Sequence, residues 1–488
     1  MRPRVIASLL AVALTVAPTV DAQIVHVDAD APGPVHDGAT WCTAYQQLHA
    51  ALAAATPGSS VHIAAGSYRP DPTGLADPRE ATFALPGGLD LRGGYAGCGE
   101  PDPDRRDPLA YPTVLSGDLA GDDPIGGRDD NAYTVVTAAQ LSGTVILDGL
   151  VIRGGEGEGE RTGGGLQVLG STVHLLDCTL EDNRSWRGGA IYAEAAALQC
   201  HRCRFRGNTT TGEGGAIFHA TAGLVLDTCL LALNTAGSDG GAVFSDLAQV
   251  QVLGCSLGGN TSGGRGGAIY DYVGVETQVV NTILWGNLDT FGAGETSQIF
   301  LNPSNLLHID HSCVQGWSGA FGGEGNLGGD PLLRDLAAGD LHLAPGSPCI
   351  DAGDDGMVFI QLDLDGNPRI VGEHVDLGCY EAPAPTGVRE ARGAAGILGV
   401  TANPGAPRQW IRFRPPARAD WSLELCDLRG RRLARLDGGA GEPAMVAPRE
   451  VSWNGRQAGG RRLPAGIYLA VLRQDDRIID AARLVRLR

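Results

Sequence analysis

Four aromatic residues recur at one position of a sequence repeat, and acidic residues or a histidine follow them closely. The rings belong to Tyr192, Phe218, Phe244 and Tyr270, and the neighbouring polar residues are Glu194, His219, Asp246 and Asp271. Rings offer a flat apolar surface with a polar edge, which suits binding to a sugar chain. If Ile191 and its equivalents point inward, alternation turns the rings outward. These eight residues are therefore the candidate ligand-binding set. The alternative stays open that the rings are core, because a register change of one residue exchanges the faces.

A second group of residues could bind Ca²⁺. Asp363, Asp365 and Asn367 place oxygen atoms at alternate positions around Gly366, which is how calcium loops supply their ligands. The bidentate Glu that such loops use is missing at the expected place. A plain Asp/Asn turn without metal is the other interpretation, and no other cofactor is expected.

The 11 cysteines leave at least one thiol unpaired. We expect two disulfides in irregular terminal structure, Cys42–Cys98 and Cys349–Cys379, each closing a long loop. Four further cysteines stand at one position of the repeat: Cys178, Cys203, Cys229 and Cys255. They are expected to act as small buried hydrophobic residues. Bridges between neighbouring copies remain an alternative.

The elements that must position these residues repeat with a period of about 26. A Gly-Gly-Ala-Ile/Val block begins at Gly188, Gly214, Gly240 and Gly266, and an Asn follows each repeat cysteine position at a distance of five. Apolar residues alternate in two short runs before each Asn, and the glycine block supplies a third strand. Three strands and three turns per repeat predict a right-handed parallel β-helix, a solenoid in which like residues stack on like.

The rest of the chain divides by composition. Residues 1–22 have the charged start, apolar run and small-residue end of a secretory signal peptide. Residues 23–381 are assigned to the β-helix, and an amphipathic stretch within 40–56 is expected to be a helical cap. Residues 382–400 are rich in Pro, Gly and Ala and predict a linker. Alternating strands in 401–488 predict a small β-sandwich.

Net charge, the length of the apolar runs and the absence of Lys limit the functions that can be expected. The formal charge is −19, so nucleic acid is not an expected partner. After the signal peptide no run is long enough to span a membrane. The sequence contains no Lys, so a catalytic base of a lyase would have to be Arg, His or Tyr.

Three resemblances add to this pattern. The glycine blocks and Phe205-Arg-Gly-Asn208 resemble the repeats of chlamydial polymorphic outer-membrane proteins and pectate-lyase-like β-helices. Residues 347–353 (SPCIDAG) with 376–381 (DLGCYE) are similar to the closing coil of secreted β-helix proteins of the choice-of-anchor kind. Residues 453–456 (WNGR) and 463–468 (LPAGIY) resemble the Ig-like domain of flagellar hook-assembly proteins and C-terminal sorting domains. This last resemblance implies a sorting or attachment module that engages secretion machinery.

Together these features predict an all-β protein that is secreted or held at the outer surface of a Gram-negative-type bacterium. We expect it to bind polysaccharide or another cell-surface component without catalysis. One alternative is a polysaccharide lyase or glycoside hydrolase of the pectate-lyase-like superfamily, and another is a self-associating adhesin. Fold alone does not choose among them.

Overall fold

The structure is a computed structural model, and it describes residues 23–123, 127–383, 396–401, 409–415, 420–426, 431–439, 449–457, 461–463, 466–474 and 477–486. The chain divides into two compact units, Met1–Pro383 and Ala384–Arg488. The predicted signal peptide and residues 384–395 of the predicted linker lie outside the described residues. Among the described residues, no helix is long and apolar enough to cross a membrane.

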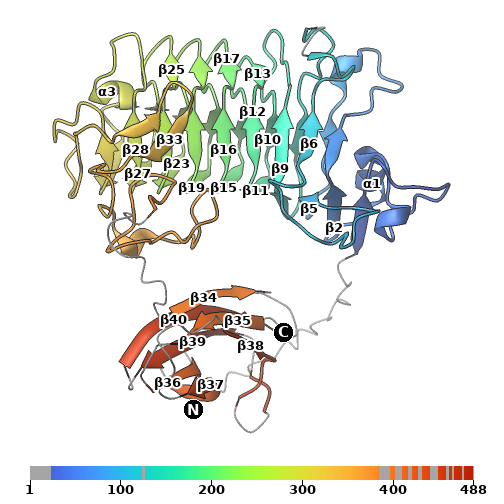
Figure 1. Cartoon of the computed structure of the whole chain (residues 1–488). Coiled ribbons are helices and arrows are strands. Elements are labelled where there is room, and N and C mark those ends of the chain that lie inside the picture. The colour runs from blue at the N-terminus through green and yellow to red at the C-terminus, as the bar shows by residue number, and fades with distance from the viewer. Residues whose placement is uncertain are drawn as a thin grey trace, which may run out of the picture. The chain divides into compact units, whose positions relative to one another are not determined.

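The first unit is a parallel β-helix whose coils contribute strands to three long parallel sheets (Figure 1). The ten-stranded face contains β1 (Ile24–Val27), β2 (Ser60–Ala64), β5 (Asp90–Tyr95), β8 (Thr144–Asp148), β11 (Thr172–Leu176), β15 (Ala197–His201), β19 (Gly223–Asp227), β23 (Gln249–Leu253), β27 (Glu276–Val280) and β30 (Leu306–Asp310). The nine-stranded face contains β3 (Gly66–Tyr68), β6 (Thr113–Ser116), β9 (Leu150–Arg153), β12 (Thr179–Glu181), β16 (Arg204–Arg206), β20 (Leu230–Ala232), β24 (Ser256–Gly258), β28 (Ile283–Trp285) and β31 (Cys313–Val314).

The third long sheet carries the predicted ligand-binding residues. This eight-stranded face contains β4 (Phe83–Ala84), β7 (Val136–Ala139), β10 (Leu166–Leu169), β14 (Ile191–Glu194), β18 (Ile217–Ala220), β22 (Val243–Asp246), β26 (Ile269–Asp271) and β29 (Ile299–Leu301). A short fourth sheet covers the turn before it, with β13 (Arg184–Ser185), β17 (Thr209–Thr210), β21 (Thr235–Ala236) and β25 (Thr261–Ser262).

Alternation along each strand builds the core. In β23, Val250 and Val252 are fully buried, whereas Gln249 faces solvent. The coil turns from the ten-stranded to the nine-stranded face at a residue with positive φ, such as Thr228 (56°) or Gly254 (57°). This left-handed backbone reverses the chain within a very short corner. The predicted solenoid with three strands per coil is therefore present.

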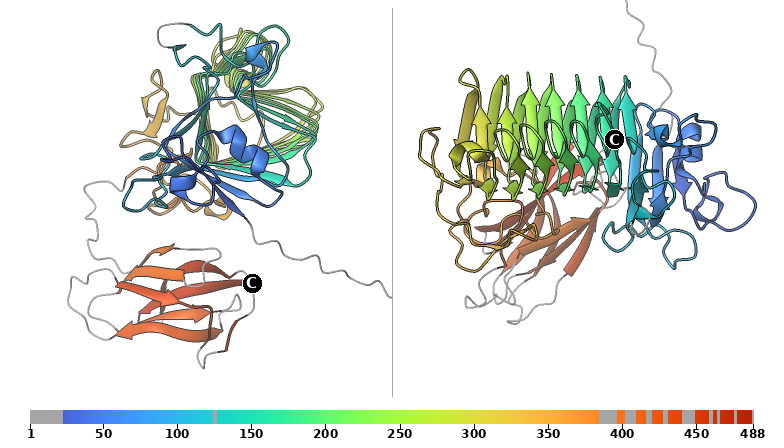
Figure 2. Two further views of the ribbon diagram at one scale, coloured as in Figure 1. Left: turned by 90° about the vertical axis from the view of Figure 1, so that its right-hand side faces the viewer. Right: turned by 90° about the horizontal axis from the view of Figure 1, so that it is seen from above.

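The N-terminal end of the rod is closed by helical structure (Figure 2). The stretch 40–56 forms a 3₁₀ turn (Trp41–Thr43) and then α1 (Leu48–Ala54), which is shorter than the predicted helix. The shortening follows because Tyr45 is extended and bridges to Val27. Leu48 and Leu52 of α1 join the main apolar cluster and cover the first coil.

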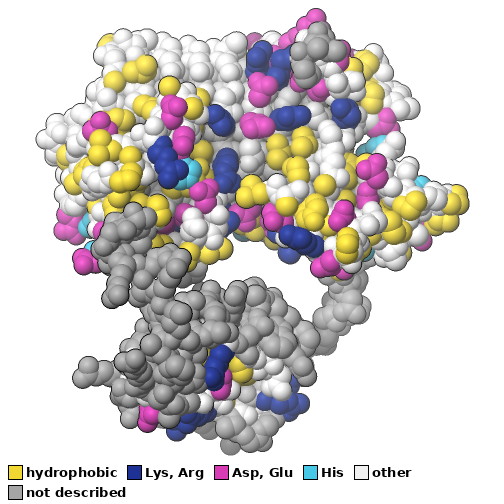
Figure 3. Space-filling model, in the orientation of Figure 1, with side chains coloured by type: hydrophobic (Ala, Val, Ile, Leu, Met, Phe, Trp, Pro, Cys, Tyr) yellow, Lys and Arg dark blue, Asp and Glu magenta, His cyan; other side chains and the backbone are white. Residues whose placement is uncertain are grey.

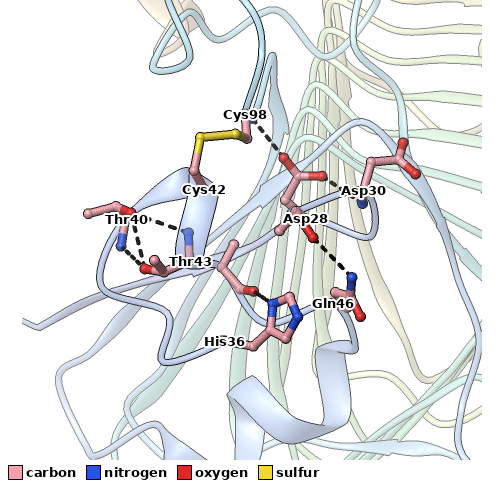
Figure 4. The surroundings of a disulfide bond; sticks show 10 residues. Asp28, Asp30, His36, Thr40, Cys42, Thr43, Gln46 and Cys98 are labelled. Carbon is pink, nitrogen blue, oxygen red and sulfur yellow. Dashed lines mark hydrogen bonds between the residues drawn. A yellow bond between two sulfur atoms is a disulfide. The ribbon is translucent and has the colours of Figure 1, made fainter. Parts of the chain in front are cut away.

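The Cys42–Cys98 disulfide ties this cap to the loop after β5, with a Cα–Cα distance of 5.0 Å (Figure 4). Asp28 supports the same junction, because its carboxylate accepts hydrogen bonds from the Cys98 N–H (2.7 Å) and the Asp30 N–H (3.0 Å). The cap is thus held by one covalent bond and a charge-assisted network.

At the other end, α3 (Glu295–Gln298) precedes β29, and residues 328–382 fold back along the rod as a closing strap. The strap contains the antiparallel pair β32 (Leu333–Asp335) and β33 (Asp340–Leu343), and Figure 1 shows β33 in front of the nine-stranded face. Leu341 packs there with Leu230 and Ala232. Two further 3₁₀ turns lie at Pro78–Glu80 and, within the strap, Asp355–Met357.

The predicted Cys349–Cys379 bridge is wrong, since both thiols are free in the structure. The two cysteines lie in separate apolar clusters, because they enter the nine-stranded face at different coils. Cys349 packs with Ile283 and Cys313, whereas the Cys379 N–H donates to the Ser256 hydroxyl at 3.1 Å.

In the second unit the described strands form two antiparallel sheets. One contains β34 (Gly396–Thr401), β35 (Gln409–Arg414) and β38 (Arg449–Trp453). The other contains β36 (Trp421–Cys426), β37 (Arg432–Gly439), β39 (Gly466–Gln474) and β40 (Arg477–Arg486). Phe413, Trp421 and Tyr468 share one apolar cluster. The unit begins earlier than its predicted start at residue 401, because β34 pairs with β35 from Gly396 onward.

Candidate functional site

The predicted aromatic residues form one row on the outside of the eight-stranded face. The residues before them, Ile191, Ile217, Val243 and Ile269, are fully buried in the rod. Tyr192, Phe218, Phe244 and Tyr270 therefore point outward, and Phe300 of β29 extends the row. Ring centroids are 5.0–5.3 Å apart and the ring planes lie within 11° of parallel. The rings make an apolar cluster of their own, separate from the core.

This stacking closes most of the row to a ligand. Each internal ring has neighbours on both faces, and Phe218, Phe244 and Tyr270 are only 6–7% exposed. The guanidinium of Arg187 lies 5.1 Å from the Phe218 ring centroid. The Tyr192 hydroxyl donates to Glu194 at 2.9 Å, and burial, with this bond second, raises the pKa of Tyr192 to about 12. A sugar ring therefore cannot stack between the internal rings.

The polar residues beside the rings divide between outside and inside. Glu194 and Asp246 face outward in register. His219 and Asp271 face inward and are fully buried, so their predicted place on the ligand-binding face is wrong. Each of these residues directly follows an outward aromatic residue, and alternation along the strand turns its side chain into the core.

The two inward residues have internal hydrogen bonds. His219 Nε2 donates to the Ala196 carbonyl at 3.0 Å, and burial lowers the pKa of His219. Asp271 accepts from the Thr277 hydroxyl at 2.8 Å, and burial raises the pKa of Asp271. Both side chains belong to the interior of the rod.

The open part of the row lies at its C-terminal end, on residues that the sequence analysis missed. Tyr272 is 47% exposed and stacks 6.2 Å from Phe244 and 6.3 Å from Tyr270. Phe291 is 73% exposed, and Arg265 lies over both Phe291 (5.5 Å) and Phe300 (4.7 Å). Tyr272 follows Tyr270 by two residues, just after β26 ends at Asp271, and this spacing is the signal that could have indicated Tyr272. We call Tyr272, Phe291 and Arg265 the open aromatic end.

A band of charged residues that the sequence also did not reveal lies at the end of the ten-stranded face and in the corner that follows it. Arg106 reaches Asp148 at 2.5 Å, and Arg202 reaches Asp177 at 2.7 Å. Burial raises the pKa of Asp148, although Arg106 opposes the shift. Asp177 and Arg202 occupy the same corner of neighbouring coils, and Arg106 comes from the loop before Pro108, so no sequence motif joins these groups. Each of the two carboxylates forms an ion pair with an Arg.

His62 lies at the N-terminal end of this band. Its ring stacks 4.5 Å from Tyr95. Burial, followed by the charges of His26 and Arg92, lowers the pKa of His62 to about 4. The imidazole is therefore a neutral stacking partner at physiological pH.

Charged pairs also gather around the turn before the eight-stranded face. Arg128 contacts Glu156 (2.5 Å) and Asp182 (2.9 Å), and Arg79 contacts Glu158 (2.8 Å). Figure 3 shows acidic and basic side chains intermingled at the upper edge of the rod near its N-terminal coils. This edge is cross-linked by ion pairs between loops.

Around Gly366, the residues predicted to bind Ca²⁺ form a hydrogen-bonded turn, and Ca²⁺ binding there stays a prediction. Asp363 Oδ1 accepts from the N–H groups of Asp365 (3.0 Å) and Asn367 (2.7 Å). Its Oδ2 accepts from the Glu381 N–H at 3.0 Å. Asp365 contacts His342 at 2.8 Å. The buried Asp363 carboxylate therefore accepts hydrogen bonds from the backbone of a turn whose tip is exposed.

Another acidic group brings Asp118, Asp122 and Asp130 together, with one ligand atom of each within 4.8 Å of the others. Carboxylate oxygens are what Ca²⁺ binds. Asp118 nevertheless directs its oxygens to the N–H groups of Gly121 (2.6 Å) and Asp123 (3.3 Å). The same carboxylate thus also organises the loop.

Comparisons with known proteins give limited matches. Residues 202–220 match a family described as the Chlamydia polymorphic membrane protein repeat. Among solved structures, the chain is similar to one titled crystal structure of pectate lyase Pel9A, with 13% identity and a TM-score of 0.39, over 75% of this chain and 98% of that chain. No curated protein sequence matches significantly. The repeat match supports the resemblance to polymorphic membrane proteins over the residues that it covers.

Proposed function

We propose that this protein is an exported β-helix rod at the bacterial outer surface that binds polysaccharide without catalysis. The signal-like start of the sequence supports export, and the name of the matching repeat family supports a surface location. The C-terminal unit would act as an Ig-like sorting or attachment module that engages the secretion machinery.

The open aromatic end is the observation that carries the binding proposal. Tyr272 and Phe291 present exposed rings, while the stacked row behind them fixes the position of Tyr272. Rigid aromatic rings lose little conformational entropy on binding, and Arg265 adds hydrogen-bond donors beside them. A sugar chain can stack on these rings and bond to the neighbouring Arg265.

The test is binding of the mature chain to neutral, amino-substituted and uronate polysaccharides, by calorimetry with Ca²⁺ and with EDTA. The double variant Tyr272→Ala, Phe291→Ala should bind roughly tenfold more weakly, equivalent to ~1.4 kcal/mol. Phe359→Ala is the matched control, because Phe359 is a 62% exposed ring of the closing strap and does not belong to the open aromatic end. A double variant that binds like the wild type, or a wild type that binds no glycan, would contradict the proposal.

Asp148 favours one alternative, a polysaccharide lyase or glycoside hydrolase. A carboxylate with a raised pKa beside Arg106 is a feature of many catalytic sites. The same polysaccharides should therefore be screened for unsaturated products and new reducing ends. Turnover that disappears in Asp148→Asn would replace the binding proposal with catalysis on the ten-stranded face.

A further inference from the structure

The closing strap is fixed to the outside of the nine-stranded face. Arg204, Leu230 and Ile283 occupy equivalent outward positions along the nine-stranded face. The two apolar residues among them lie under the strap. The Arg204 guanidinium donates to the Leu364 carbonyl at 2.7 Å. The Gly378 N–H donates to the Asn281 carbonyl at 2.8 Å. The strap is therefore an added layer over the coils.

Two cysteines meet inside this layer. Cys313 of β31 points outward, because its neighbour Val314 belongs to the rod core. Cys349 comes from the strap, and both cysteines are fully buried in one cluster with Leu343 and Leu377. The proximity of the Cys349 thiol, with burial second, raises the pKa of Cys313. The Cys313 thiol donates to the Gly329 carbonyl at 3.4 Å.

The backbone holds both residues in place. The Cys313 N–H donates to the Thr282 carbonyl at 2.8 Å in the sheet ladder. The Cys349 N–H donates to the Ser347 hydroxyl at 3.1 Å, and its carbonyl accepts from the Leu377 N–H at 2.9 Å. The two cysteines thus enter one buried cluster from fixed positions on opposite sides of the interface between coil and strap, which is a placement that a disulfide can use.

The repeat cysteines differ in backbone geometry. Cys203, Cys229 and Cys255 each stand immediately before a strand of the nine-stranded face, and because those strands pair in register, their Cβ atoms are expected to keep the strand spacing of ~4.8 Å. A disulfide needs Cβ atoms about 3.5–4.5 Å apart. Their thiols donate to carbonyls instead, as Cys229 does to Cys200 at 3.2 Å.

We propose that Cys313 and Cys349 form a disulfide in the exported protein and lock the closing strap onto the last coil. The proposal requires export into an oxidising compartment, as proposed above, but not glycan binding. A disulfide donor such as oxidised glutathione supplies the oxidant. One thiolate attacks the donor and releases one donor thiol, and the second thiolate displaces the other donor thiol. Two protons and two electrons thereby pass to the donor, and one S–S bond is exchanged for another.

Thiol burial sets the order of events. Thiolates are the attacking species, and the raised pKa of Cys313 disfavours its thiolate in the folded structure. Cys349 is fully buried, so a disulfide donor cannot reach it once the strap has docked. Exchange therefore takes place while the strap is docking, before the cluster closes. Afterwards the bond is shielded from reductant.

Peptide mapping of the full chain tests the proposal. The protein is refolded with increasing oxidised glutathione until Cys42–Cys98 is completely linked, denatured, alkylated and digested without reduction. Cys313–Cys349 peptides should be linked in most molecules, while Cys178, Cys229 and the other repeat cysteines are alkylated. Alkylated Cys313 and Cys349 in that sample, or a Cys349–Cys379 link, would overturn the proposal.

A stability comparison gives a second readout. Refolding with a reductant in place of oxidised glutathione should lower the unfolding midpoint of the wild type more than that of Cys313→Ser, because the variant retains only Cys42–Cys98. Cys379→Ser is the matched control, since Cys379 is also fully buried under the strap and should leave the reduction-dependent shift unchanged. Equal shifts in the wild type and Cys313→Ser would show that no second bond exists.

Discussion

The side chain of Asn234 supplies hydrogen bonds that the backbone cannot make at the turn after the nine-stranded face. Its Nδ2 donates to the Phe205 carbonyl (3.0 Å) and to Asn260 Oδ1 (2.9 Å). Its Oδ1 accepts from the N–H and the Nδ2 of Asn208, both at 3.0 Å. Asn183, Asn208, Asn260 and Asn287 are buried in the same way. A stacked, internal Asn ladder follows from the constant distance between each Asn and the preceding repeat position, and the structure confirms it.

Replacing one Asn of the ladder should destabilise the rod strongly. Asn234→Leu keeps the volume but leaves the Asn208 N–H and the Phe205 carbonyl without partners. Buried polar groups of this kind cost ~1–3 kcal/mol each, so we expect a loss of roughly 3 kcal/mol or more in unfolding free energy. The measurement is denaturant unfolding. Thr235→Leu, an exposed neighbour, should stay within ~0.5 kcal/mol of the wild type. Equal midpoints for the two variants would contradict the role of the ladder.

Glu381 should make strap stability depend on pH. Glu381 pairs with Arg369 in the interior of the strap, and burial raises its pKa from 4.5 to about 8 despite that pairing. The folded chain thus binds one more proton than the unfolded chain between these values. The contribution is fully present below pH 4.5 and is lost as pH rises through about 8.

The free energy of unfolding of the rod should therefore fall by on the order of 3 kcal/mol between pH 5 and pH 9 because of this group. Glu381→Gln mimics the neutral form, so the difference between wild type and variant isolates Glu381 from the other carboxylates. Chemical unfolding at several pH values measures it. Parallel pH profiles for the two proteins would show that Glu381 is ionised throughout.

At the scale of elements, sequence was informative where side chains repeat. The 26-residue period predicted the coils, and alternation around Ile217 and Val243 predicted that Phe218 and Phe244 point outward. These features are local, because each depends on strand geometry within one coil. The cap was also predictable, although α1 is short.

The wrong side assigned to His219 and Asp271 is a local error, because the alternation was not followed one residue past the rings. The other missed features are set by contacts between distant segments and were not predictable. The closure of the ring row depends on stacking between coils. The Asn ladder ends on Gln298, whose side chain accepts from Asn287 Nδ2 at 2.8 Å, and no repeat leads to that residue. Cys349 lies against Cys313 because the strap folds back, which spacing cannot show.

At the scale of the whole molecule, charge separates the two units. Residues 401–488 carry 17 Arg against 9 acidic residues, whereas residues 23–400 carry 18 Arg against 46. Two units with separate cores and opposite charge are consistent with the separate tasks proposed for them above.

The last prediction is that the second unit can be released in folded form. The chain divides into compact units at Pro383, and the second core needs only strands from β34 onward. Limited proteolysis should cut between 384 and 395, since a linker of this composition makes few contacts, and leave a basic fragment that starts near Gly396. Circular dichroism and thermal unfolding of that fragment should show a cooperative β structure, and the rod should keep its own midpoint. A fragment that unfolds on release would mean that the rod stabilises it.

In cells, deletion of residues 396–488 should change the location of an otherwise folded rod. A truncated protein at the same location would exclude the sorting role, while leaving the rod's glycan binding to be judged by the open aromatic end.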